Sequence, residues 1–444
     1  MQDLACARGG RWTLALLLVA GCRDRGHGND DDSSSSSGSD ESSSSGGGTT
    51  GTSTIGDTSD SSSTDSGNPT SGPETGSESS TGEEQHCGDG AGAAGETCFA
   101  PPQIVLEDRP TAAVALADLD LDGDLDLVAG HLDGFSTWLG DGTGSLGEPF
   151  GQSSDPIGAI AIATVDDDDW PDLVAAHPQD DRVSVRMGIG DGSFGAAIEI
   201  AVDGDGTMGN AGPRGVAASD LDGDGDTDVA VVSELDATVR IFFQGGGVFD
   251  MSTELDSGGT PVAIAIGSLT EGPGPDLAVA NFAGASVALF EHAGGQSWDP
   301  GASLAVGAGP RGLAALDLDE DGATDLVTAD AEAGSASILL RAGPDFAAAR
   351  VLAVGNQPRA VAAGDFDNDG HVDVAFALET QNAIGVLLRD AAADEFAMLP
   401  VAAVATHARP DAIAAGDLDD DGISDVVTGS AAAGGGVALL LGDP

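Results

Sequence analysis

Short apolar runs alternate with polar turns from residue 99 to the end of the chain. Each unit opens on a proline, continues as an Ala/Val/Ile run such as 359–364 (RAVAAG), and reaches an acidic turn. A second apolar run such as 373–378 (DVAFAL) follows, and then a turn and a third run. The Ala-rich runs end within about eight residues, which is too short for a stable isolated helix. The pattern therefore predicts β-strands, four to a unit.

The units form an internal repeat with a period near fifty residues. The last aspartate of the acidic turn recurs at spacings of 46, 56, 48, 49, 48 and 52 residues, at Asp126, Asp172, Asp228, Asp276, Asp325, Asp373 and Asp425. This period with four short strands is typical of propeller blades. We predict an all-β fold, a seven-bladed β-propeller over residues 99–444.

The two ends of this region predict a closed ring. The chain ends on a run that matches a third strand, 436–441 (GVALLL), while 99–108 (FAPPQIVLED) matches the fourth strand of other units. If the first segment completes the last blade, the ring closes without an open sheet edge.

Five units carry the full pattern DxDxDGxxD. Alternating carboxylates on a tight loop converge on one point, the glycine permits the turn, and oxygen ligands favour Ca²⁺ over zinc or copper. The predicted side-chain ligands are Asp118, Asp120, Asp122 and Asp126; Asp220, Asp222, Asp224 and Asp228; Asp317, Asp319, Asp321 and Asp325; Asp365, Asp367, Asp369 and Asp373; and Asp417, Asp419, Asp421 and Asp425.

An EF-hand does not fit these loops. Its twelfth position requires Glu, but the residues there are Ala129, Val231, Thr328, Phe376 and Thr428. Two units depart from the pattern: the second keeps Asp166, Asp168 and Asp172 as a weak site, and the fourth keeps only Asp276, which is predicted to bind no metal.

The repeats resemble the FG-GAP/VCBS family, whose seven-bladed propellers include the head of integrin alpha chains. The resemblance covers residues 99–444. It implies Ca²⁺ between the first and second strands of a blade, with an added carbonyl ligand from the residue after the glycine. Those residues are Asp124, Asp226, Ala323, His371 and Ile423. Related propellers also occur in polysaccharide lyases and hydrolases, so an enzyme stays open as an alternative.

The first 98 residues read as export and display elements. Arg8 and Arg11 precede the run 14–20 (LALLLVA), which is too short to span a bilayer, so 1–21 is predicted to be a signal peptide. Residues 19–22 (VAGC) resemble a bacterial lipobox, which implies lipidation of Cys22 and a membrane attachment. Arg23 then implies an outer-membrane or cell-surface location.

The remaining N-terminal residues predict a stalk and a clip. Residues 22–86 are Ser, Gly, Thr and acidic residues that cannot bury a core, so they form a disordered linker. Within 87–98, Cys87 and Cys98 are an even pair in an oxidising compartment, which favours a disulfide. A metal site would need two further ligands nearby.

Composition limits the partners. The formal net charge of -60 excludes nucleic acid as a partner, because phosphates would be repelled. Aromatic residues are only 4%, so the core must consist of small side chains. Two GxGxxG matches, 142–147 and 190–195, precede no helix and are predicted to be hairpin turns rather than dinucleotide sites.

Basic and histidine residues leave the choice of function open. An arginine flanks the opening proline in five units, at Arg109, Arg214, Arg311, Arg359 and Arg409, at the opposite end of the strand from the acidic turn. These arginines either bind an anionic glycan or surface protein or pair with acids of the neighbouring blade.

His131 and His177 are predicted to have surface or loop roles, and no nucleophile has a sequence-local base. The leading hypothesis is a monomeric, surface-anchored Ca²⁺-binding propeller that works as a binding or adhesion module. An enzyme or a purely structural surface protein are the alternatives.

Overall fold

The computed structural model describes residues 99–166, 168–203, 211–390, 395–397, 404–406 and 408–442. The predicted signal peptide, lipidated Cys22, linker and Cys87–Cys98 clip lie outside the described residues. The part of the chain that is described contains no helix long and apolar enough to cross a membrane.

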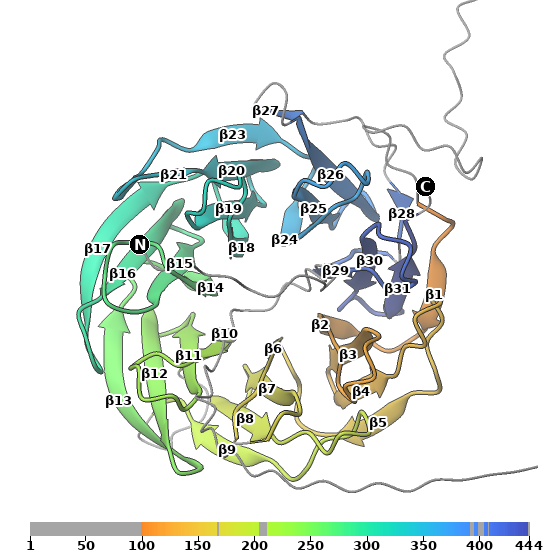
Figure 1. Ribbon diagram of the computed structural model, residues 1–444, viewed down its shortest axis with the longest axis horizontal. Helices are drawn as coiled ribbons and strands as arrows, with labels where there is room; N and C mark the ends of the chain where they lie inside the picture. The colour runs from red at the N-terminus through yellow and green to blue at the C-terminus, as the bar shows by residue number, and fades with distance from the viewer. Residues whose placement is uncertain are drawn as a thin grey trace, which may run out of the picture. The chain divides into compact units, whose positions relative to one another are not determined.

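Seven antiparallel sheets form a ring of blades around a central axis (Figure 1). Strands are given from the innermost outward. Blade 1 is β2 (Thr111–Ala117), β3 (Asp126–His131), β4 (Gly134–Trp138) and β5 (Phe150–Ser153); blade 2 is β6 (Ala159–Ala163), β7 (Asp172–His177), β8 (Arg182–Arg186) and β9 (Ile198–Ala201); blade 3 is β10 (Pro213–Ser219), β11 (Asp228–Ser233), β12 (Thr238–Gly245) and β13 (Val248–Asp256); blade 4 is β14 (Pro261–Gly267), β15 (Asp276–Asn281), β16 (Ser286–His292) and β17 (Trp298–Ala305).

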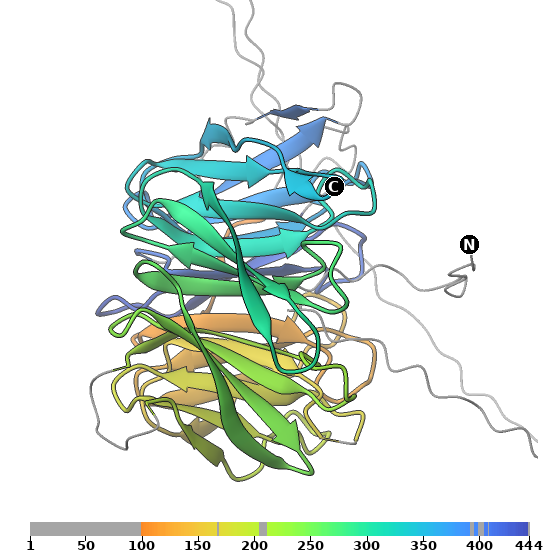
Figure 2. The same ribbon diagram turned by 90° about the vertical axis from the view of Figure 1, so that its left-hand side faces the viewer.

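The remaining blades continue the same order. Blade 5 is β18 (Pro310–Leu316), β19 (Asp325–Asp330), β20 (Ser335–Leu339) and β23 (Arg350–Ala353), with the hairpin β21 (Arg341–Ala342) and β22 (Asp345–Phe346) before β23; blade 6 is β24 (Pro358–Gly364), β25 (Asp373–Leu378) and β26 (Ala383–Asp390), which pairs with both β27 (Glu395–Ala397) and β28 (Val404–Ala405); blade 7 is β29 (Ala412–Gly416), β30 (Asp425–Gly429), β31 (Val437–Leu440) and β1 (Gln103–Leu106). The strands run from one face of the ring to the other (Figure 2).

The ring closes as predicted from its ends. The first strand, β1, pairs with the last, β31, and Phe99 bridges Gly442. The innermost strands of neighbouring blades contact one another all the way round, including β2 with β29. The segment that leads into blade 1 is therefore held within blade 7 by strand pairing, in addition to the packing between the two blades.

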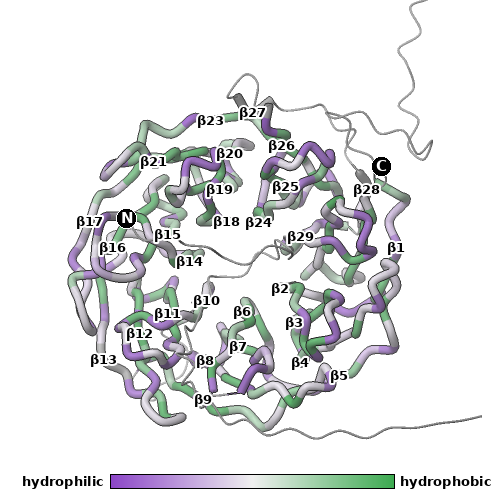
Figure 3. The backbone as a smooth tube through the Cα atoms, in the orientation of Figure 1, coloured by the Kyte–Doolittle hydropathy of each residue, from purple (hydrophilic) through white to green (hydrophobic). Residues whose placement is uncertain are grey.

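The hydrophobic core is divided into seven clusters, one between each pair of adjacent blades. The second strand of each blade supplies both neighbouring clusters: Leu127 and Ala129 of β3 pack toward blade 7, while Val128 packs toward blade 2. Both faces of these strands are covered, so their sequences are continuous apolar runs rather than alternating ones (Figure 3). The innermost strands are rich in Ala because the blades converge there.

A buried aspartate at the start of each second strand fixes the blade internally. Asp126 accepts the N–H of Leu119 at Oδ2 (2.7 Å) and the N–H of Gly140 at Oδ1 (2.8 Å). The same two bonds, between 2.6 and 3.0 Å, recur in all seven blades at Asp126, Asp172, Asp228, Asp276, Asp325, Asp373 and Asp425. Each carboxylate thus joins the exit of the first strand to the end of the third.

The donors at the end of the third strand also link blades. Gln244, whose N–H bonds Asp228, donates its side-chain amide to the Val165 carbonyl of blade 2 (2.8 Å). Arg341 and Arg389 likewise reach carbonyls of Ser268 and Asp319 in the preceding blades, both at 2.7 Å. These three side chains therefore couple blades 3, 5 and 6 to the preceding blade at the acidic turns.

We expect Asp276→Asn to destabilise the fold by about 3 kcal/mol, because the amide nitrogen cannot accept the backbone N–H groups and buried donors are left unpaired. Asp276 accepts from Leu269, Thr270 and His292 in a blade whose turn lacks the aspartates at positions one, three and five. Urea unfolding with and without chelator measures the effect, which should not depend on metal. The control is exposed Asp299→Asn on β17, and equal stability of the two variants would contradict the role given to Asp276.

Candidate functional sites

The acidic turns all lie at one rim of the ring. In blade 1 the turn joins β2 to β3, whose ends are paired as Ala117 with Asp126. The equivalent turns of the other blades join the first to the second strand in the same way. We call this rim the acidic face.

Each complete acidic turn is organised by its third aspartate, at position five. Its Oδ1 accepts the N–H of the residue after the glycine at 2.8 to 3.0 Å, in the pairs Asp122–Asp124, Asp224–Asp226, Asp321–Ala323, Asp369–His371 and Asp421–Ile423. The glycine between them has a positive φ of 83° to 104°. The bond therefore fixes the backbone of the residue predicted to give a carbonyl ligand.

Position four of these turns is also left-handed. Leu121 has φ 57°, and Glu320, Asn368 and Asp420 have φ 55° to 61°. A side chain such as Leu is unfavourable in this region. The turn thus contains two left-handed residues, where the sequence had indicated one.

The structure gathers carboxylates in these turns. Oxygen atoms of three aspartates lie within 4.8 Å of one another in five named groups, which are Asp118, Asp120 and Asp122; Asp166, Asp168 and Asp172; Asp220, Asp222 and Asp228; Asp317, Asp319 and Asp325; and Asp365, Asp367 and Asp373. The second-blade turn has Thr164 in place of the first aspartate and Asp169 in place of the glycine, and it still retains a three-carboxylate group. In the seventh blade Asp417 accepts the N–H groups of Asp421 (3.1 Å) and Gly422 (3.0 Å).

Two orphaned oxygens show that these turns suit a cation. Oδ1 of Asp120 and Oδ1 of Asp317 are buried without a hydrogen-bond partner among the described residues. Burial and the charges of Asp122 and Asp118 raise the pKa of Asp120. Several carboxylates with unpaired oxygens are a fitting donor set for a hard divalent cation.

The environment of these turns also shifts the pKa of buried aspartates that begin second strands. Burial raises the pKa of Asp126, Asp172 and Asp325 to about 6, and of Asp373 and Asp425 to about 8, against the opposing effect of their backbone hydrogen bonds. A cation beside them would favour the ionised form.

Chelation should lower Tm, and added Ca²⁺ should restore it, because an ion that binds the folded state stabilises it by about 2.7 kcal/mol per site at one hundred times its Kd. Asp317→Asn should reduce the Ca²⁺-dependent rise in Tm, because it removes the charge of the carboxylate that carries the unpaired oxygen. Differential scanning calorimetry across a Ca²⁺ series measures both. Asp345→Asn, at an exposed position of β22, is the control. A melting curve indifferent to chelator and to Ca²⁺ rejects the site.

The opposite rim carries the predicted arginines, and we call it the arginine face. It comprises the loops that enter the innermost strands and the turns between the second and third strands. Arg109 donates to Asp133 (2.9 Å), Arg214 pairs with Glu234, and Arg359 pairs with Glu379. Arg409 also pairs with Glu379, which is 2% exposed and whose pKa the two arginines lower against the effect of burial.

Pairing with an acid of the neighbouring blade, one of the two alternatives, holds for Arg409 and in part for Arg359, and was wrong for the other three arginines. Arg109, Arg214 and Arg359 bind acids of their own blade, because the start of the first strand lies beside the turn that follows the second strand. Arg359 Nε also lies 3.9 Å from Oδ1 of Asp411, directly before β29 of blade 7. Arg409 pairs across to blade 6. Arg311 makes no ion pair with any described residue and lies over the ring of Phe282, with its Cζ 4.4 Å from the centroid.

The predicted surface or loop roles of His131 and His177 were also wrong. Both side chains are 0–1% exposed at the ends of β3 and β7. His131 Nε2 contacts Ser136 Oγ (3.2 Å), and His177 Nε2 contacts Ser184 Oγ (2.8 Å). The serines are only 1–2% exposed, so no substrate reaches either Ser–His pair and their role is structural.

The hydrogen bonds around His131 assign its protonation. Thr111 donates to the Arg109 carbonyl, so its hydroxyl oxygen accepts from His131 Nδ1–H (2.9 Å). Arg109 donates to Ser136 Oγ (2.8 Å), so the serine proton is directed to Nε2 of His131. The network requires a neutral imidazole, and burial followed by the Arg109 charge lowers the pKa of His131 to about 4.

We expect His131→Gln to reduce the loss of stability on acidification. The unfolded chain takes up a proton near pH 6.5 and the folded chain only near pH 4, so falling pH favours unfolding within this window. The contribution is complete above pH 6.5 and lost near pH 4, and amounts to about 3 kcal/mol. Urea unfolding of both proteins at pH 7, 5.5 and 4.5 gives the difference. Parallel pH profiles would contradict the assignment.

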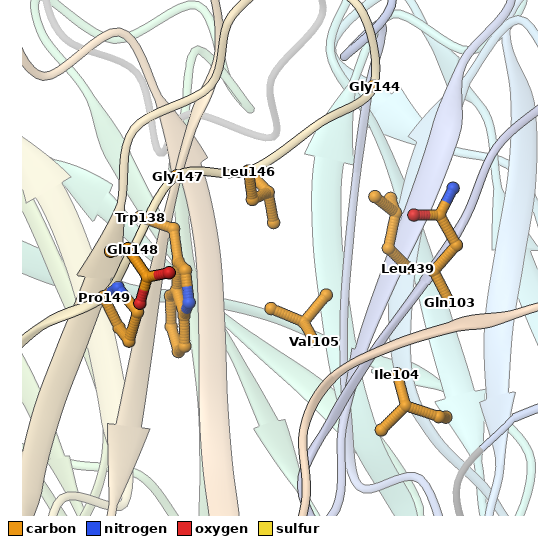
Figure 4. A pocket seen from close by; sticks show the side chains of 10 residues that line it. All are labelled: Gln103, Ile104, Val105, Trp138, Gly144, Leu146, Gly147, Glu148, Pro149 and Leu439. Carbon is orange, nitrogen blue, oxygen red and sulfur yellow. The ribbon is translucent and has the colours of Figure 1, made fainter.

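A cavity of about 320 Å³ lies at the seam between blades 7 and 1 (Figure 4). Its lining comes from β1, Leu439 of β31, Trp138 of β4 and the connection 144–149. Glu148 is the one ionisable side chain among the ten lining residues. The cavity therefore offers no acid–base pair.

Comparison with known proteins agrees with this architecture. The FG-GAP-like repeat family matches residues 165–231 and 317–376. No curated protein matches the sequence. At these residues the chain thus carries FG-GAP-like repeats, within a seven-bladed β-propeller.

Solved structures share the fold at low identity. BBS1N in complex with ARL6DN has a TM-score of 0.52 and 14% identity, and the match covers 77% of this chain and 96% of that one. The virginiamycin B lyase from Staphylococcus aureus has a TM-score of 0.52 and 12% identity, over 78% and 99% of the two chains. A 6-phosphogluconolactonase-like protein from Bacteroides fragilis has a TM-score of 0.50 and 15% identity, over 68% and 85%.

Proposed function

We propose that this protein is a Ca²⁺-stabilised binding or adhesion module for a glycan or protein ligand. The supporting observation is the repetition of carboxylate groups in equivalent turns of one face. A catalytic metal site would need one turn that differs from the others, whereas these turns recur with the same Asp positions and the same backbone bonds. Ca²⁺ in these turns would stiffen the blades and leave the opposite face for a ligand.

The proposal includes display outside the cell. A lipid on Cys22 would attach the protein to the outer membrane or cell surface, and the residues of 22–86 would act as a tether. A Cys87–Cys98 disulfide would lie directly before Phe99, the residue that bridges the closing strand. The propeller itself would act as a monomer.

Among the described residues, the burial of the Ser–His contacts and the lining of the seam cavity favour binding over the enzymatic alternative. The two Ser–His contacts are buried, and the seam cavity has a single ionisable lining residue. General acid–base catalysis needs a positioned proton donor or acceptor within reach of substrate.

Incubation of residues 99–444 with acidic oligosaccharides tests the proposal. We expect retention without cleavage, and weaker retention after chelation because the blades lose their stabilising ion. Gel filtration measures retention and chain length together. Shortened chains would support a lyase or hydrolase instead. Absence of binding to glycans and to extracted surface proteins, with and without Ca²⁺, would leave a structural role.

A further inference from the structure

Four consecutive blades place equivalent residues on the arginine face. The second residue of the innermost strand is Arg214, Val262, Arg311 or Arg359 in blades 3 to 6. Twenty residues later, the turn after the second strand begins with Glu234, Phe282, Ala331 or Glu379. Each of these turn residues donates its N–H to a carbonyl 22 residues earlier, at 2.8 to 3.2 Å, so the four positions are structurally equivalent.

This equivalence explains why Arg311 has no acid partner. Arg214 and Arg359 bind the glutamate at the turn position of their own blade. Blade 5 has Ala331 at that position, and its N–H bonds the Gly309 carbonyl (2.9 Å) just as Glu234 bonds Gly212 (3.1 Å). The backbone is the same and the carboxylate is missing.

The surroundings of Arg311 leave its charge available to an external anion. Its guanidinium lies over Phe282 of blade 4, and no described residue gives it a hydrogen-bond or ion-pair partner. Burial and the nearby charges of Arg359 and Arg214 lower its pKa, while Glu234 and Glu379 act in the opposite direction. Both of those glutamates are already held by their own arginines.

We propose that Arg311 anchors an oxyanion subsite that receives a carboxylate or sulfate group of an acidic polysaccharide. The guanidinium offers two parallel donors that match either group, and the Phe282 ring supports it from below. The net charge of -60 repels densely charged polymers, so the subsite suits a ligand whose anionic groups are widely spaced. This inference rests on the proposed binding function and assigns its contact residue.

The missing glutamate supplies the test. Ala331→Glu would place a carboxylate where Glu234 meets Arg214, and so neutralise Arg311 internally without removing it. Ala333→Glu adds the same charge two residues further along the same turn, at an exposed position, and is the matched control. Arg311→Met keeps the packing on Phe282 and removes the charge.

Calorimetric titration should use the Ca²⁺-loaded protein with three oligosaccharides of equal length. A hyaluronan oligosaccharide carries one carboxylate per disaccharide, its carboxyl-reduced form carries none, and a kappa-carrageenan oligosaccharide carries one sulfate. We expect binding of a charged probe, no binding of the reduced one, and a loss of about tenfold or more in both Arg311→Met and Ala331→Glu, as for a charged hydrogen bond. Ala333→Glu should stay within about twofold of wild type. The probe that binds decides between carboxylate and sulfate.

Different outcomes separate this subsite from the general function. Binding that is unchanged in Arg311→Met and Ala331→Glu overturns the subsite and leaves the binding function standing. If wild type binds no oligosaccharide, the Tm rise in sodium sulfate over sodium chloride at equal ionic strength is compared among the folded proteins. A larger rise in wild type and Ala333→Glu than in Ala331→Glu supports the oxyanion subsite alone. Equal rises overturn it.

Discussion

The fold depends on seven buried carboxylates that bond backbone N–H groups from two strands at once. The aspartate accepts two N–H groups, one at the exit of the first strand and one at the end of the third. Each of these groups bonds the carboxylate instead of a carbonyl of the sheet. Unpaired buried donors are costly, so each carboxylate is required for its blade. Asp276 shows that this role does not need the predicted metal ligands, since blade 4 keeps both bonds without aspartates at positions one, three and five.

Metal binding would then be an addition to a turn that is already closed by hydrogen bonds. The buried aspartate at position nine belongs to three of the named carboxylate groups together with positions one and three. An ion there would contact the same residue that holds the blade, and would offset the repulsion among carboxylates and the left-handed backbone of residues such as Leu121. Stabilisation by Ca²⁺ would therefore reach the blade core through a single side chain.

The sequence predicted the fold well because each signal was local and repeated. The period near fifty residues, the acidic turn and the matching end segments were enough for seven blades and for the closing pair β1 and β31. The buried histidines were missed for a physical reason: polar residues at the end of β3 and β7 look like turn residues until the neighbouring serines are placed beside them. Their spacing of five and seven residues across a hairpin was the available signal. The position-four conformation was equally hidden, since Leu121 and Glu320 give no sign of a positive φ.

The arginines show where repeat comparison adds to single-motif reasoning. Reading each Arg next to its proline predicted a ring of similar groups, yet the three at the start of β10, β18 and β24 differ in the residue twenty positions later. Two of them face a glutamate and are neutralised within the blade, whereas Ala331 leaves Arg311 to an aromatic ring. In a repeat fold, equivalent backbone positions make the absence of one side chain as informative as its presence, because the neighbouring blades show what the partner would have been.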